Sequence, residues 1–297
     1  GRAPELLAGN FSGSGTLSSS ANAFNGTFNF DGLGPYSGTM NGHFFGPAAE
    51  EVGATWRATD GSGGVASGTF VGGRDAAATN TVNGLNDLTA PTDLPFSAFH
   101  TANSAGDVTN VNYDPATQTY RISFTDTHLQ GAPTRVVELS PASQAAGGTA
   151  SFAAYAGNVA DFSYTAKLLI PSATNPTLAL TYASLADISR STNAANFTSA
   201  TRDFVAFGVP TPSLTMPRSG NGTFSGTVLG KGSVEARTAN GSTLNTYSLS
   251  GTSLLRADFF NTSFTAQLAL NGVNTVDGGT LAFSPYNFNG TITGASF

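Results

Sequence analysis

Cysteine is absent from this chain of 297 residues, so neither a disulfide framework nor a thiolate metal site can form. Charge is also sparse, because charged residues make up only 10% of the sequence and the 12 basic residues are scattered rather than gathered in a stripe. Together with a net charge of −6, this disfavours a phosphate-binding surface. We therefore expect no nucleic-acid partner.

Long apolar runs are missing as well. No stretch approaches the roughly 20 residues that span a bilayer as a helix, and residues 1–10 lack a basic region followed by an apolar stretch. We expect any signal peptide or lipid-bearing cysteine to lie outside this chain. Contact with a membrane would then come only through such an anchor.

Glycine and phenylalanine are abundant, with 36 and 22 residues, and the apolar content is 39%. This composition predicts a folded core of many short strands joined by tight turns. The segment "NAFNGTFNF" shows the pattern, because Phe24, Phe28 and Phe30 alternate with polar residues as in a half-buried antiparallel strand.

The sequence divides into three segments by glycine and proline content and by the length of the expected strands. Residues 1–75 and 222–297 carry glycine-rich alternating strands, about five in each, whereas residues 76–221 hold most of the prolines and longer strands. The stretch 76–95 shows neither the helical nor the strand period of apolar residues, and this indicates a linker. Each glycine-rich segment alone would leave unpaired strand edges, but together they supply about ten strands, enough for a closed barrel of the eight-strand kind.

The stretch "GHFFGPAAEEVGATW", followed by "ASGTFVGGRD", resembles the C-terminal signature of the transferrin-binding protein B-like family. In that family, an aromatic-Phe-Gly-Pro-x-Ala-x-Glu-Val-Gly-Gly pattern enters the last barrel strands. The residues that match it are Gly46, Pro47, Ala49, Glu51, Val52 and Gly53, and Ala54 departs from the usual second glycine. The structural motif comprises Phe44, Phe45, Gly46, Pro47, Glu50, Glu51, Val52, Gly53 and Trp56.

A second block, residues 175–185 with 204–228, is similar to the handle-to-barrel transition of members from Gram-negative bacteria. The resemblance implies an all-β fold in which an antiparallel eight-stranded β-barrel adjoins an antiparallel handle sheet. It also implies a non-enzymatic protein of the outer leaflet of the outer membrane, or a secreted one, that binds a host or environmental partner through handle and barrel loops. Partners known in the family are transferrin, haem or haem proteins, and complement regulators.

The order of the segments differs from that family, where the Phe-Phe-Gly-Pro strands come last. One interpretation is that the early strands of 222–297 and the late strands of 1–75 close one barrel in circularly permuted order, with 76–221 as a handle-like domain. The other is that half-barrels are completed by strand exchange between subunits. The protein would then be a structural component of an oligomer or filament.

Glu50 and Glu51 do not predict a catalytic pair, because adjacent residues on a strand point to opposite faces and cannot flank one bond. We expect "GPAAEE" to form a turn or bulge in which a glutamate accepts hydrogen bonds from backbone N–H groups, and Trp56 to fill the barrel interior. No other acid, base and nucleophile come together in the sequence, so we expect no enzyme.

Three histidines, His43, His100 and His128, show no metal-ligand spacing, and no metal site is predicted. Because the family includes haem binders, these histidines are candidates for a haem contact, ahead of Met40 and Met216. Asp126 and His128 could share one strand face as a metal or haem-edge site, but a solvated polar face is the favoured interpretation.

Overall fold

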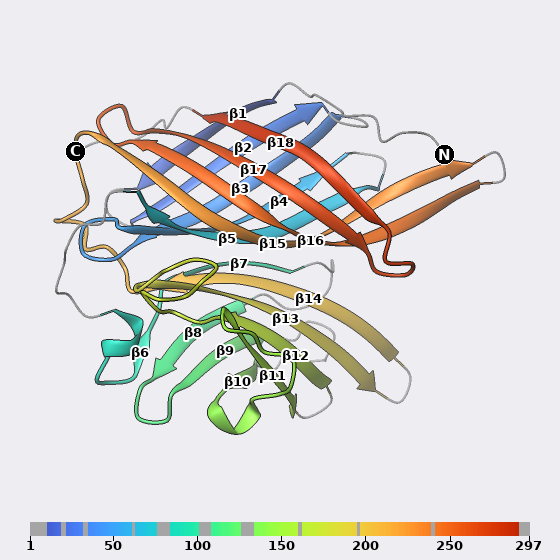
Figure 1. The fold of residues 1–297 in the computed structure, drawn as a ribbon, viewed down its shortest axis with the longest axis horizontal. Coiled ribbons are helices and arrows are strands. Elements are labelled where there is room, and N and C mark those ends of the chain that lie inside the picture. The colour runs from blue at the N-terminus through green and yellow to red at the C-terminus, as the bar shows by residue number, and fades with distance from the viewer. Residues whose placement is uncertain are drawn as a thin grey trace.

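The computed structural model describes ten ranges of the chain: 11–18, 22–31, 35–60, 63–75, 84–100, 108–125, 134–159, 162–194, 197–238 and 241–290. Over these ranges the protein is all-β, with three antiparallel sheets arranged as layers (Figure 1). The helical elements described are two 3-10 turns, η1 (Leu85–Asp87) and η2 (Pro141–Ser143). No helix in these ranges has the length and apolar character to cross a membrane.

The largest sheet draws its strands from both ends of the chain. Its N-terminal strands are β1 (Phe11–Ser18), β2 (Ala23–Asp31), β3 (Pro35–Phe45), β4 (Glu51–Thr59) and β5 (Val65–Arg74). Its C-terminal strands are β15 (Asn221–Thr238), β16 (Gly241–Asp258), β17 (Ser263–Asn274) and β18 (Thr280–Gly290). Strand β5 pairs with β15, with Val71 opposite Thr227, so the two glycine-rich segments form one continuous sheet within a single chain.

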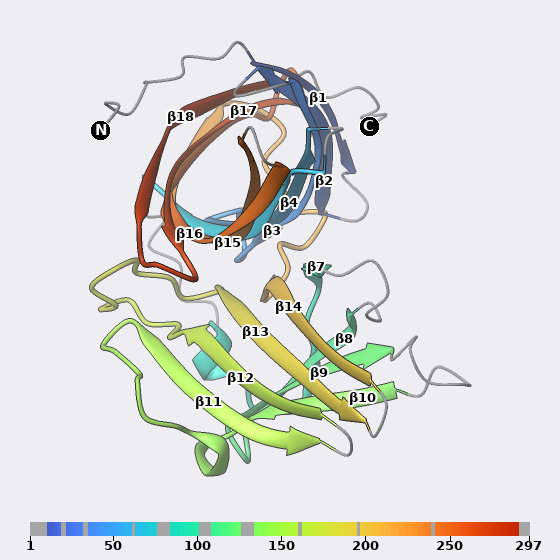
Figure 2. The same ribbon diagram turned by 90° about the vertical axis from the view of Figure 1, so that its right-hand side faces the viewer.

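This sheet curls around its own core without closing into a barrel (Figure 2). It has nine strands, and its edges are β1 and β18. Every neighbouring pair is antiparallel, so the first and the ninth strand run in the same direction and no antiparallel ladder can join them. The expected closed eight-stranded barrel is therefore wrong in both strand number and closure.

The described part of the C-terminal segment also has four strands rather than about five. The difference lies in β18, because residues 280–290 form one strand where the runs at 279–283 and 287–294 indicated two. Strands β15 and β16 each extend over 18 residues and have glycines inside them. Gly226 shows why glycine is needed there: a Cβ atom at this position would lie 2.0 Å from the carbonyl oxygen of Val71 on β5. These glycines allow the close approach of neighbouring strands rather than a reversal of the chain.

Large side chains fill the concave side of the curled sheet. Trp56 is buried there, as expected, and Phe44 packs against both Phe224 and Phe259, with ring centroids 5.6 and 5.7 Å apart. Rings from β3 and β15 thus meet in one core. Aromatic contacts therefore hold the two chain segments together from inside the sheet.

Residues 76–221 form two sheets where a single handle sheet was expected. The four-stranded sheet contains β6 (Thr92–Asp93), β8 (Val108–Asp114), β9 (Thr119–Thr125) and β10 (Thr134–Leu139). The five-stranded sheet contains β7 (Phe96–His100), β11 (Phe152–Val159), β12 (Phe162–Leu169), β13 (Ala183–Ala194) and β14 (Phe197–Gly208). The two sheets bury a shared core, because one face of each is apolar.

Part of the expected linker belongs to this core. Leu85 and Leu94 are buried against the two sheets, so residues 84–95 are packed structure rather than a spacer. The other part of that expectation, residues 76–83, lies outside the described residues.

Candidate functional site

The five-stranded sheet lies between the other two layers and uses both of its faces (Figure 2). Toward the large sheet it presents Leu185 and Ala206, which pack with Phe45 and Val71 in a separate apolar cluster. This contact is small compared with the two main cores. Polar contacts between the large sheet and the five-stranded sheet add to this apolar cluster.

Glu51 is a buried carboxylate at this junction. Its turn, residues 46–49, is tight because Gly46 and Ala49 adopt positive φ angles of 84° and 60°. One carboxylate oxygen of Glu51 accepts the backbone N–H of Thr181 at 2.6 Å, and the other accepts those of Tyr182 at 2.9 Å and Ala183 at 2.6 Å. A side chain of the large sheet thus binds the backbone that leads into β13.

The neighbouring carboxylate acts locally. Glu50 accepts the backbone N–H of Ala48 at 2.8 Å and stabilises the turn from inside. Burial raises the pKa of Glu51 to about 7, the three N–H donors oppose that rise, and the nearby charge of Glu50 adds to it. Both glutamates are buried against backbone groups, so their geometry is that of an anchor between layers.

Next to this junction, a groove of about 340 Å³ opens between the five-stranded sheet and the outer face of the large sheet. Its walls come from β12, β13 and β14 on one side and from β15, β16 and the β17–β18 turn on the other. The groove is lined by Ser163, Thr165, Ser189, Arg190, Ser191, Ala200, Thr201, Arg202, Lys231, Thr246 and Thr275. Its volume is in the range of small-molecule pockets, roughly 300–1,000 Å³.

Two of the three cations in the groove are neutralised. Arg190 donates to both oxygens of the fully buried Asp203, at 2.7 and 3.1 Å, and stacks over the Phe124 ring at 4.2 Å. Arg202 binds both oxygens of Asp187, at 2.7 and 2.5 Å, and reaches across to the Ser248 hydroxyl at 3.0 Å. The hydrogen bond from Arg202 to Ser248 ties β14 to β16.

Lys231 is the third cation and differs from the other two. Over the described ranges it has no ion-pair or hydrogen-bond partner, although it is about half buried. Burial lowers the pKa of Lys231, and the nearby charge of Arg202 lowers it further. The ammonium group is therefore an unmatched positive charge at the groove wall.

Of the three candidate haem histidines, the structure describes the side-chain surroundings of His43 alone. His43 lies half-buried on β3, where burial lowers its pKa, and its ring centroid is 6.3 Å from that of Phe45. The backbone of His100 ends β7 opposite Asp203, whereas Asp126 and His128 lie outside the described residues. Among the residues described, no group of three or more His, Asp or Glu side chains could hold a metal ion.

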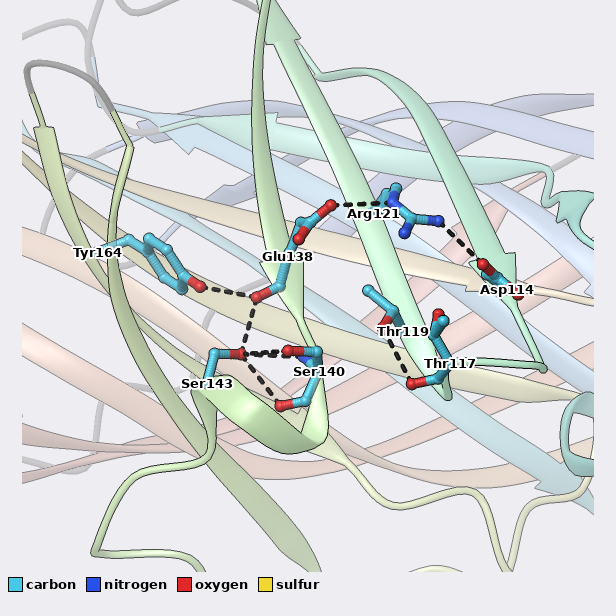
Figure 3. A network of polar contacts seen from close by, with 8 residues as sticks. All are labelled: Asp114, Thr117, Thr119, Arg121, Glu138, Ser140, Ser143 and Tyr164. Atoms are coloured by element: carbon cyan, nitrogen blue, oxygen red, sulfur yellow. Dashed lines mark hydrogen bonds and ion pairs between the residues drawn. The ribbon is translucent and has the colours of Figure 1, made fainter.

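A second polar cluster lies at the far side of the four-stranded sheet, away from the groove. Figure 3 shows Arg121 between Asp114 and Glu138, at 3.4 and 3.0 Å, with the Tyr164 hydroxyl donating to the Glu138 carbonyl oxygen at 2.7 Å. Ser143 donates to the same carbonyl at 2.9 Å. Arg121 pairs with both carboxylates, so the cluster joins the sheets and offers a ligand no unpaired cation.

Sequence reasoning missed the groove entirely. A signal was present: Ser163 and Thr165 on β12 alternate with buried Tyr164 and Ala166, which places hydroxyls on one face of the strand. This alternation predicts which face of β12 carries the hydroxyls, but it does not predict which sheet packs opposite that face. The long-range pairing of β5 with β15 was needed to bring Lys231 over that face.

Comparison of this chain with known protein families, curated proteins and solved structures finds no match. The structure shows an all-β protein with antiparallel sheets, and no family is identified.

Proposed function

We propose that this chain is a non-enzymatic ligand-binding protein of the transferrin-binding protein B-like type, located at the bacterial cell surface or secreted. Its ligand occupies the groove between the large sheet and the five-stranded sheet. The observation that carries the proposal is an unmatched lysine facing a row of hydroxyls across a groove of small-molecule size. The resemblance of residues 42–56 supports the cell-surface assignment.

An enzyme is the weaker interpretation of the same groove. Its lining contains no carboxylate, and Asp187 and Asp203 are each bound to an arginine of the lining, so neither is free to accept a proton from a substrate. Haem also fits the groove poorly, because its lining is rich in hydroxyls and contains no histidine. We expect the visible spectrum of haemin to be unchanged by the protein, and equally unchanged by the variant His43→Ala.

Filling the groove tests the proposal. Ser189 is exposed on the wall of the groove, so Ser189→Trp should block it, whereas Ser250→Trp adds the same side chain to an exposed position on β16 that does not line it. Both variants and the wild type would be incubated with an extract of small molecules and analysed by native mass spectrometry. A bound mass in the wild type and Ser250→Trp, absent from Ser189→Trp, is expected. Equal retention by all three would contradict binding in the groove.

The second candidate is a structural component assembled by strand exchange. The observation that favours it is the open sheet, whose edges β1 and β18 are unpaired with each other. Size-exclusion chromatography with light scattering separates the two candidates. A monomer of 30.1 kDa supports the ligand-binding function, and a larger stable assembly supports the structural one.

A further inference from the structure

The hydroxyls of the groove are free to bind a ligand. Over the described ranges, no side-chain partner exists for five of them: Ser163, Thr165, Ser189, Ser191 and Thr246. A hydroxyl both donates and accepts hydrogen bonds. A surface of closely spaced hydroxyls therefore matches a ligand that itself carries several hydroxyls, and it offers little to an apolar one.

The hydroxyls come from opposing layers. Ser163 and Ser189 lie on the five-stranded sheet, whereas Thr246 lies on β16 of the large sheet. A ligand between them could bind both walls at once. This arrangement favours a compact molecule with polar groups around its rim, as in a sugar ring.

The charge of the groove selects among such molecules. Lys231 stands directly opposite Ser248 on β16, and Ser248 accepts the hydrogen bond from Arg202. The Arg202 guanidinium is held by Asp187, so Lys231 supplies the charge that remains unmatched. A ligand anion beside Lys231 would restore neutrality in a partly enclosed site, where ion pairing is stronger than in open water.

We propose that the groove binds a sugar acid, whose carboxylate pairs with Lys231 and whose hydroxyls bond the serine and threonine side chains of the two walls. The inference rests on the proposed ligand-binding function and names its ligand class. A uronic acid meets both requirements in one ring. The same unit occurs as a free monosaccharide or at the end of an acidic polysaccharide, and the groove chemistry is the same for both.

The two lysines of the chain make a selective experiment possible. Reductive ¹³C-methylation keeps their charge and gives one NMR signal for each side chain, and the variants Lys231→Met and Lys167→Met assign the signals. Lys167 is the matched control, because it is exposed on β12 but does not line the groove. The probes are D-glucuronate, D-glucose with hydroxyls but no charge, propionate with charge but no hydroxyls, and an oligogalacturonate.

We expect D-glucuronate to shift the Lys231 signal saturably and leave the Lys167 signal in place, with apparent affinity at least tenfold higher than for glucose or propionate. Lys231→Arg should keep binding, and Lys231→Met should lose at least tenfold in affinity as measured by calorimetry. Stronger binding of the oligomer than of the monomer would identify a polysaccharide end as the source.

Propionate acting as well as glucuronate, or no saturable shift with either sugar acid, would overturn the sugar-acid assignment. If Ser189→Trp still abolished capture of some other small molecule, the ligand-binding function would stand and only its ligand class would fail. If neither a sugar acid nor any captured molecule depended on the groove, both would fail together.

Discussion

Glu51 shows how one side chain can attach two layers. Its carboxylate accepts three backbone N–H groups at the entry to β13. Each buried donor left without an acceptor costs about 1–3 kcal/mol. We predict that Glu51→Ala lowers the free energy of unfolding by several kcal/mol on that scale, measured by chemical denaturation.

The matched control for that prediction is Glu138→Ala. Glu138 also binds a partner, Arg121, but its side chain is 55% exposed, and exposed ion pairs contribute about 0–1 kcal/mol. If the two variants lost equal stability, Glu51 would not be the anchor that its contacts indicate.

The pKa of Glu51 gives a second prediction at this scale. Folding raises it from 4.5 to about 7, so the folded state binds more protons than the unfolded state across that window. The contribution of Glu51 to stability is therefore complete below pH 4.5 and is lost as the pH rises to about 7, by roughly 3 kcal/mol at most. The neutral variant Glu51→Gln should lack this loss.

The comparison of wild type with Glu51→Gln is needed because His43 acts in the opposite direction. Burial lowers the pKa of His43 below 6.5, so its contribution is lost as the pH falls through that region. Subtracting the stability curves of the two proteins, measured from pH 4 to 8, removes the shared histidine effect. A flat difference curve would contradict the raised pKa of Glu51.

Among the strands, aromatic rings cover glycines on the neighbouring strand. Phe24 on β2 is opposite Gly42 on β3, and a Cβ atom at Gly42 would lie 2.3 Å from the Phe24 ring. The ring thus occupies the space that a side chain at position 42 would need. Such aromatic and glycine pairs fix the register of a sheet.

We predict that Gly42→Ala destabilises the protein by about 1–3 kcal/mol, because the added methyl overpacks the core against Phe24. In the background Phe24→Leu, the same substitution should cost less. A double-mutant cycle by denaturant unfolding measures this coupling. Gly232→Ala is the control, since its Cβ would approach only the flexible side chain of Leu249, at 3.3 Å. Additive losses would show that the ring and Gly42 do not compete for space.

Local elements were the most predictable part of the structure. Alternation predicted about five strands in the N-terminal segment, and its described residues form five. The C-terminal count was one too high, because residues 280–290 form one strand, β18, where two alternating runs indicated two. Sheet closure was not predictable from either segment, since it depends on the direction in which the two outermost strands run.

The candidate site depends on contacts of even longer range. Lys231 and Ser189 are distant in sequence and belong to different sheets, so no local pattern joins them. A glutamate of the turn was expected to accept backbone N–H groups, and Glu50 accepts that of Ala48. The donors to Glu51, however, are at residues 181–183. Tertiary packing, rather than a local sequence motif, therefore determines what Glu51 and Lys231 face.

At the level of the whole molecule, one ladder between strands joins the two ends of the chain and forms one wall of the groove. Strand β5 pairs with β15 in the same chain, and this pairing forms the surface on which the five-stranded sheet rests. It also places Lys231 opposite the hydroxyls of β12 and β13. If the two glycine-rich segments paired between subunits instead, each groove would belong to a dimer.

A single engineered disulfide tests this pairing most directly. Gly73 and Ser225 are directly opposite on β5 and β15, and opposed antiparallel residues have Cα atoms about 4.5–5.5 Å apart, within the range of a disulfide. The chain has no other cysteine to compete. We predict that Gly73→Cys with Ser225→Cys, oxidised and run on a non-reducing gel, gives one internally linked band at 30.1 kDa. A disulfide-linked dimer or ladder of larger species would contradict a sheet completed within one chain.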